Sequence, residues 1–221
     1  MRPSPTVLAF DTSAAHCAAA LLSGGAIVAA HREEMGRGQA ERLMPLLEEM
    51  LRDAGLGWRD LDGIGVGVGP GNFTGIRIAV SAARGLALGL GVPAVGVTGF
   101  EARALGLKGP VLVALPAPRD TLYLQLVMDG RPEGAARQMA AEDLPGAFDL
   151  PPGTRVAGHR AEALATALGI AVAPPPAEDV AAAIARLAAT RLDPPQPRPA
   201  PLYLRPADAA PPADPPPVIL P

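Results

Sequence analysis

A glycine-rich segment, residues 67–78, restricts the fold more than any other part of this sequence. It reads Gly-Val-Gly-Pro-Gly-Asn-Phe-Thr-Gly-Ile-Arg-Ile and lies between an apolar run and a helical pattern. Glycines at 69, 71 and 75 allow close approach of another backbone or of a ligand, and Thr74 is predicted to cap the following helix. Such a corner at a helix N-terminus often holds an anion. The segment predicts a tight strand-to-helix turn and is the first place to seek a site.

The patterns around this turn predict alternating strands and helices. Apolar runs predict strands at residues 7–10, 17–22, 26–30, 64–68 and 93–97, and helical spacing predicts helices at 39–54 and 75–90. Pro45 fits the first helix only near its first turn or at a kink. The order of three strands, helix, strand, helix, strand is that of an actin-like, ribonuclease-H-like half-domain, in which the turn after the first strand faces a cleft.

The patterns of the second half of the chain are less distinct, and no internal repeat is evident in the sequence. Paired strands are predicted at 111–115 and 121–128, a turn at 130–134, and helices at 161–168 and 178–192. We therefore expect an α/β fold, a mixed sheet flanked by helices with two related subdomains. The predicted divisions are an actin-like subdomain at 1–104, a degenerate one at 105–198, and a proline-rich tail at 199–221, extended or disordered.

Composition argues against several classes of function. The net charge of −3 and the 3% aromatic content lack the basic surplus and stacking side chains of a direct nucleic-acid binder. Cys17 is the single cysteine, which excludes an intramolecular disulfide, and the three histidines lack the spacing of metal ligands, so no metal is expected. The apolar stretches are too short or too interrupted for a signal-peptide core or a bilayer span. We expect a soluble cytoplasmic protein that does not contact a membrane.

The sequence patterns of common catalytic sites are missing. A phosphate-binding P-loop needs Lys and Ser/Thr after its last glycine, but Gly75 precedes Ile76 and Arg77, and a dinucleotide-binding loop needs glycine where Asn72 stands. There is no Gly-x-Ser-x-Gly segment and no His-x-x-x-His helix. No catalytic residue is therefore assigned.

Two polar features remain as candidates for anion binding. The turn 11–13, Asp-Thr-Ser, fits a phosphate-contacting turn, although these residues also cap turns structurally, which is the interpretation we favour. Arg77 in the first turn of a helix opposes the helix dipole and should have a partner, either an internal carboxylate, which we favour, or a bound anion. The candidate anion-binding residues are Thr12, Ser13, Gly69, Gly71, Thr74 and Arg77.

Apolar residues of the two predicted N-terminal helices form a second set of candidates. On pattern alone they are ordinary core, but a stripe wide enough to reach beyond the sheet would also meet a partner. The candidate interface residues are Met44, Leu46, Leu47, Met50, Ile76, Val80, Ala83 and Leu90.

Five segments together resemble the TsaB (YeaZ) family. They are residues 10–13, 40–47, 67–78, 96–102 and 201–206, dense over 7–104 and sparse beyond. The resemblance implies a non-catalytic actin-like subunit that pairs with its paralogue TsaD and, with the ATPase TsaE, supports transfer of a threonylcarbamoyl group to the adenosine beside the tRNA anticodon. It implies contact with tRNA only through the complex. It also implies that ATP or ADP binds at a partner interface and not to the isolated chain. A further implication is that the chain can form a homodimer when it is without its partner.

Two segments depart from the family pattern. Gln39 stands where many relatives have histidine, and residues 115–119, Leu-Pro-Ala-Pro-Arg, replace a usual Asp-Ala-Arg, which removes a carboxylate from the inter-domain cleft. Two other functions stay open beside the scaffold role: an actin-like phosphotransferase, suggested by Asp11 and the glycine-rich turn, and a peptidase of the M22 type, suggested only by the name of the wider family.

Overall fold

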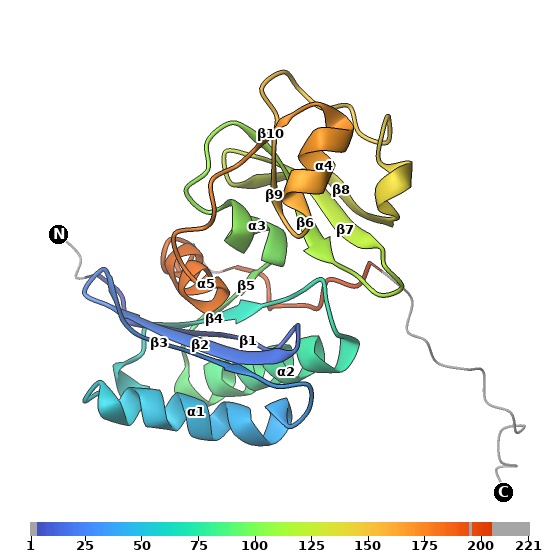
Figure 1. The fold of residues 1–221 in the computed structure, drawn as a ribbon. Helices are drawn as coiled ribbons and strands as arrows, with labels where there is room; N and C mark the ends of the chain where they lie inside the picture. Colours follow the sequence, from blue (N-terminus) through green and yellow to red (C-terminus); the bar gives the residue numbers. More distant parts are fainter. Residues whose placement is uncertain (1–3, 195, 205–221) are drawn as a thin grey trace, which may run out of the picture.

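The chain forms two five-stranded mixed sheets that share one strand order (Figure 1). The first has the order β3-β2-β1-β4-β5 and the second the order β8-β7-β6-β9-β10. In each sheet, the first three strands in chain order pair antiparallel. The fourth and fifth strands run parallel to the central strand, which is β1 in the first sheet and β6 in the second. The structure is a computed structural model that describes residues 4–194 and 196–204. The repeated order confirms the predicted α/β, actin-like fold with two related halves.

The first sheet is covered by helices on both faces. Its strands are β1 (Val7–Asp11), β2 (His16–Ser23), β3 (Ala26–Glu34), β4 (Gly63–Gly67) and β5 (Ala94–Val97). Helices α1 (Gln39–Asp53) and α2 (Phe73–Leu90) lie on one face and α5 (Val180–Ala189) on the other, and the short 3-10 helix η1 (Trp58–Asp60) leads into β4. Leu8 and Phe10 of β1 pack toward α1 and α2, whereas Val7 and Ala9 pack toward α5. Burial on both faces explains why this strand reads as an unbroken apolar run.

The second half repeats the sheet with fewer helices. Its strands are β6 (Pro110–Pro116), β7 (Leu122–Met128), β8 (Arg131–Met139), β9 (Arg155–Gly158) and the two-residue β10 (Ala171–Val172). Helix α4 (Ala161–Leu168) connects β9 to β10. Between β8 and β9 the chain forms only the 3-10 helix η2 (Ala141–Asp143), where the first half has the fifteen-residue α1. The second half is degenerate in this sense.

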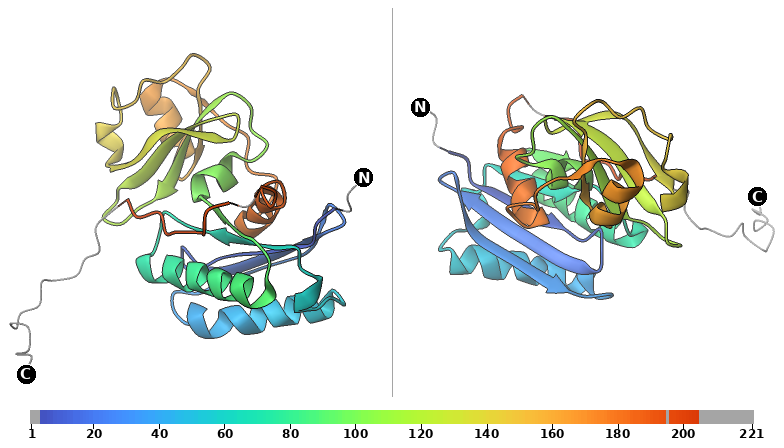
Figure 2. Two further views of the ribbon diagram at one scale, coloured as in Figure 1. Left: turned by 180° about the vertical axis from the view of Figure 1, so that it is seen from behind. Right: turned by 45° about the horizontal axis from the view of Figure 1, so that its top comes forward.

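The helix that follows each fifth strand crosses to the other half. Helix α3 (Gly99–Ala104) follows β5, but its Phe100 and Ala104 pack with Val111 and Val113 of the second sheet. Helix α5 packs against the first sheet although it follows the second sheet in sequence. Both helices lie between the two sheets (Figures 1 and 2). The subdomain boundaries at residues 104 and 198 remain predictions. Because α3 packs on the second sheet and α5 on the first, each half of the chain contributes a helix to the core of the other half.

Most predicted elements are confirmed, with ends that differ by a few residues. The segment 130–134 was predicted as a turn, but a strand, β8, begins at Arg131 and its pairing with β7 is irregular opposite residues 124–126. Strands β9 and β10 were missed because they are only four and two residues long. Pro45 lies inside α1 beyond its first turn, with its side chain exposed, so the first-turn position was wrong and a kink stays the predicted alternative.

Two further predictions concern the membrane and the C-terminal tail. Of the described residues, only α2 is long and apolar enough to cross a bilayer, a test that a core helix also passes. Residues 205–221, most of the predicted proline-rich tail, lie outside the described residues.

Candidate functional site

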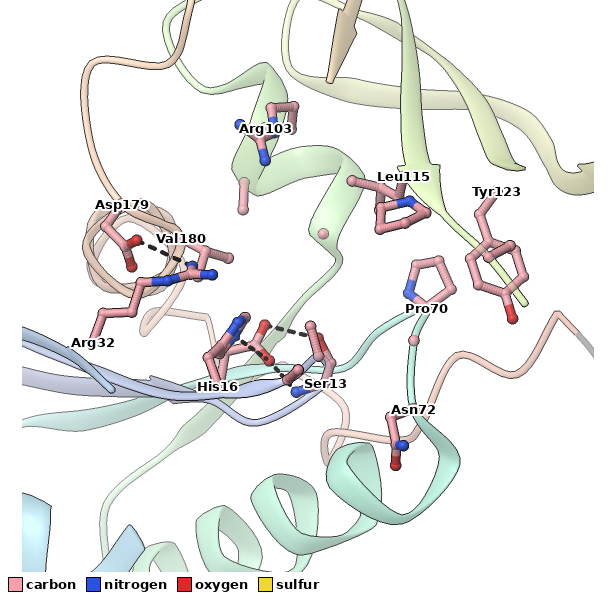
Figure 3. A pocket seen from close by; sticks show the side chains of 18 of the residues that line it. Ser13, His16, Arg32, Pro70, Asn72, Arg103, Leu115, Tyr123, Asp179 and Val180 are labelled. Carbon is pink, nitrogen blue, oxygen red and sulfur yellow. Dashed lines mark hydrogen bonds and ion pairs between the residues drawn. The ribbon is translucent and has the colours of Figure 1, made fainter. Parts of the chain in front are cut away.

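A cleft of about 620 Å³ opens between the first sheet and the second half of the chain (Figure 3). The turn between β1 and β2 forms its floor, and residues 70–72 of the glycine-rich corner form one wall. Helix α3 and residues 115–118 at the end of β6 enclose it from above, and residues 176–180 before α5 close the remaining side. The turn after the first strand thus faces a cleft, as the sequence predicted.

Asp11 is the buried carboxylate on the floor of this cleft. Its Oδ1 accepts a hydrogen bond from the Ser13 backbone N–H at 2.5 Å, and its Oδ2 accepts one from the Ser13 hydroxyl at 3.1 Å. The Nε2 of His16 lies 3.7 Å from Oδ1. Burial by itself raises the pKa of Asp11, but the neighbouring imidazole and the two bonds from Ser13 outweigh it, so the pKa lies below its ordinary value. Asp11 is therefore a charged group that already has local donors.

The glycine-rich corner holds α2 tightly against the turn that follows β1. A Cβ on Gly75 would lie 1.9 Å from the Thr12 carbonyl oxygen, and one on Gly71 would lie 2.2 Å from that of Ser13. The Thr12 hydroxyl donates to the Gly75 carbonyl at 2.7 Å. Glycine is required at 71 and 75 because the two backbones are in contact there.

The residue that caps α2 is not the predicted one. Asn72 Oδ1 accepts a hydrogen bond from the Gly75 N–H at 2.9 Å, while Thr74 lies inside the first turn with its side chain exposed. The prediction that Thr74 caps α2 was wrong, because α2 begins two residues earlier than the sequence pattern indicated.

Arg77 points away from the cleft and contacts aromatic residues. Its Nε donates to the Tyr203 hydroxyl at 2.9 Å, and its guanidinium carbon lies 3.9 Å from the centroid of the Phe73 ring. Among the described residues it forms no ion pair, so the favoured carboxylate partner was wrong. Tyr203 was the missed partner; its only signal was its place in the segment 201–206.

The structure brings together only part of the predicted anion site. Ser13 and Gly71 line the cleft; Thr12, Gly69, Thr74 and Arg77 do not. Three other polar residues of the cleft, His16, Arg32 and Arg103, were not predicted. No local pattern marks Arg103, which reaches the cleft only because α3 crosses between the sheets. Anion binding by the predicted set remains a prediction.

Most of the predicted interface residues belong to the core. Leu46, Leu47, Met50, Ile76, Val80 and Ala83 are buried, and Met44 and Leu90 are partly exposed. The outward face of α2 instead presents Leu88, which is 82% exposed. A Cβ on Gly85 or Gly89 would meet nothing within 4 Å. The interface prediction was wrong for the six buried residues, because their side chains pack in the core against the sheet, and for Met44 and Leu90 it stays a prediction.

The described residues contain no group of three or more His, Cys, Asp or Glu side chains that could hold a metal ion. The charged and titratable side chains that line the cleft are Asp11, His16, Arg32, Arg103, Tyr123, Glu178 and Asp179.

Comparison with known proteins finds relatives whose names concern tRNA modification. Residues 30–192 match the family model described as TsaD: tRNA N6-adenosine threonylcarbamoyltransferase. The tRNA threonylcarbamoyladenosine biosynthesis protein TsaB of Haemophilus influenzae is 34% identical over 129 residues, 56% of this chain and 54% of that protein. TsaB of Escherichia coli K12 is 38% identical over 100 residues, 45% of this chain and 43% of that protein. The chain thus spans about half the length of the curated relatives it matches.

The solved structures add a match over nearly the whole fold. YeaZ from Pseudomonas aeruginosa superposes with a TM-score of 0.68 at 26% identity, covering 90% of this chain and all of that one. These findings confirm the resemblance drawn from the five sequence segments. Since the family model covers well over half of the sequence, the chain belongs to the TsaD family, and within it to the TsaB (YeaZ) members.

Proposed function

We propose that this chain is a non-catalytic cytoplasmic subunit in the biosynthesis of tRNA threonylcarbamoyladenosine, which pairs with a TsaD-like paralogue and works with a TsaE-like ATPase. The names of its TsaB relatives support the pathway. The net charge of −3 and the low aromatic content support contact with tRNA through the partner. The observation that carries the proposal is the outer face of α2.

Helix α2 is apolar yet largely uncovered in the free chain. Only 28% of its 18 residues are buried. Helices α1 and α2 lie side by side on the face of the first sheet that is turned away from the second half (Figures 1 and 2). The exposed Leu88 and the open positions at Gly85 and Gly89 let another helix approach closely. The exposed residues of α2 up to Arg84 are polar, so its open apolar part is residues 85–90. An apolar helix end left open to water favours a protein partner, and the partly exposed Leu90 of α2 and Met44 of α1 would join the contact.

The test is to mix the chain with the TsaD-like protein of the same organism and to measure the mass of the product by light scattering. We expect a heterodimer, and we expect Leu88→Glu to weaken it at least about tenfold because a charge would be buried in the contact. Val172→Glu is the matched control, since Val172 is also an exposed apolar residue but lies on β10 of the second half. Equal weakening by both variants, or no complex with the unmodified chain, would contradict the proposal. The mass of the free chain decides between monomer and homodimer.

An actin-like phosphotransferase is the second candidate, favoured by Asp11 on the floor of the inter-sheet cleft. It predicts that the isolated chain binds ATP with magnesium in a calorimetric titration. The scaffold proposal instead predicts no heat from the isolated chain and places any nucleotide at the partner interface, so the nucleotide content of the purified complex separates the two.

A further inference from the structure

We propose that the cleft between the two sheets binds a small molecule with one anionic group, a carboxylate or a phosphate, on an apolar body, and that Arg103 is the cation that holds it. This site lies on the opposite side of the first sheet from the outer face of α2, so the inference does not depend on the proposed function.

Arg103 is a cation in the cleft that receives no direct contact from an acceptor among the described residues. It extends from α3 into the space above His16 (Figure 3). It forms no hydrogen bond or ion pair with any described residue. Its burial lowers its pKa below the ordinary value, and the charge of Asp179 offsets this only in part. A half-buried guanidinium has five donors to satisfy, and leaving them without acceptors is costly. An anion in the cleft would remove this cost.

His16 is a second unsatisfied group that lines the same space. It is only 5% exposed. Among the described residues its Nδ1 has no hydrogen-bond partner, and its Nε2 reaches only Asp11 Oδ1, at 3.7 Å, which is too long for a hydrogen bond. Nearly all buried side-chain polar atoms in folded proteins are hydrogen-bonded, so such a ring calls for a partner from outside the described chain. His16 and Arg103 face the cleft from opposite sides, the first from β2 and the second from α3.

The carboxylates around the cleft, in contrast, already have donors. Glu178 accepts both of its bonds from Arg186 Nε at 2.7 Å. Asp179 accepts from the Ala181 N–H at 3.2 Å and pairs with Arg32 at 3.4 Å. Asp11 is bonded twice by Ser13. Of the charged side chains that line the cleft, Arg103 is the one without such a bond among the described residues, so the cleft lacks an acceptor rather than a cation.

The remaining walls favour one anionic group over a chain of phosphates. Residues 115–118 and Pro70 are apolar, and Pro70, Pro116 and Pro118 have no backbone N–H to offer. Phosphate chains are usually held by several backbone N–H groups of a loop, which these prolines remove. A cleft of about 620 Å³ with apolar walls and few polar groups has the character of a small-molecule site.

The experiment is a calorimetric titration of the full chain with benzoate, phenyl phosphate and the uncharged benzyl alcohol, and separately with ATP and magnesium. We expect one of the two anions to bind saturably and benzyl alcohol to bind at least about tenfold more weakly. Benzoate and phenyl phosphate distinguish a carboxylate ligand from a phosphate ligand. In the same titration, Arg103→Gln should weaken the anion about tenfold or more. Arg59→Gln, an exposed arginine on η1, is the control and should leave binding unchanged.

A second measurement keeps the test independent of folding defects. Thermal unfolding confirms that both variants are folded, and the imidazole NMR signals of His16 should shift when the anion saturates the unmodified chain. The proposal is overturned if neither anion binds at millimolar concentration, or if Arg103→Gln binds as tightly as the unmodified chain. Tighter binding of ATP than of both simple anions would also overturn it.

Discussion

Arg77 and Tyr203, 126 residues apart in sequence, are joined by a hydrogen bond of 2.9 Å from the guanidinium Nε to the phenol oxygen. Phe73 completes the contact, with its ring centroid 4.8 Å from that of Tyr203 and 3.9 Å from the guanidinium carbon. The segment 199–204 is thereby held against the N-terminal end of α2. Because α2 begins at Phe73, Arg77 lies beyond the first turn in which it was predicted, and its charge is stabilised by aromatic faces rather than by a carboxylate.

The same segment is held at two further points and packs on both halves. Arg84 Nε donates to the Pro199 carbonyl at 2.7 Å, and the Leu202 N–H donates to the Val68 carbonyl at 2.8 Å. The Leu202 side chain packs against the core between the first sheet and α2 and also against the core between α3 and the second sheet. Residues 199–204 therefore act as a strap across the two halves.

Removing the Arg77–Tyr203 contact should loosen this strap measurably. Tyr203→Phe deletes only the hydrogen bond and should lower the free energy of unfolding by about 0.5–1.5 kcal/mol. Arg77→Ala also removes the cation–aromatic contact and should lower it further, by about another 0.5–1 kcal/mol. Urea unfolding measures both, with Arg59→Ala as the control. A double variant whose loss equals the sum of the two single losses would show that the residues do not interact.

Two glycines of one helix should respond in opposite directions to the same substitution. Gly75→Ala puts a methyl group 1.9 Å from the Thr12 carbonyl oxygen, so it should destabilise the chain by about 3 kcal/mol or more. Gly85→Ala meets nothing within 4 Å and should stabilise the isolated chain by about 1 kcal/mol through helix propensity. Thermal and urea unfolding test the pair. Similar effects at both positions would show that Gly75 is not a point of backbone contact.

Asp11 should make stability depend on pH in the acidic range. Its pKa in the folded chain lies below the ordinary value of 3.8, so the folded state binds fewer protons than the unfolded state at acidic pH. Its stabilising contribution is therefore complete above 3.8 and is lost as the pH falls through the folded pKa. Urea unfolding from neutral pH down to below 3.8 should show a steeper loss for the unmodified chain than for Asp11→Asn. The exposed Glu41→Gln should keep the steeper profile, and identical profiles for the chain and Asp11→Asn would contradict the assignment.

Cys17 should be chemically silent in the native protein. It is buried in β2, and burial, reinforced by the nearby Glu33, raises its pKa to about 11. The thiolate is the reactive form, so iodoacetamide at pH 8 should leave the folded chain unmodified and label it fully in urea. Because the chain has one cysteine, mass spectrometry reads the result directly. Rapid native labelling would show that β2 is accessible.

The sequence by itself determined the elements of the first half and the glycine corner. The unbroken apolar run of β1 and the helical spacing of α1 and α2 are local patterns, because burial of a strand or of one helix face repeats with the period of the element. Gly71 and Gly75 were also readable in advance, since only glycine allows two backbones to touch. Five short segments were enough to indicate the family.

Only the tertiary structure decided which surfaces are free and which residues meet in the cleft. The apolar positions of α1 and α2 carry no mark that separates core from interface, and the sheet covers six of the eight that were predicted. Arg103 and His16 come from α3 and β2 and face one space because α3 crosses between the sheets. Tyr203 meets Arg77 across 126 residues. These contacts depend on how the two halves pack, which the periodicity within a single element does not encode.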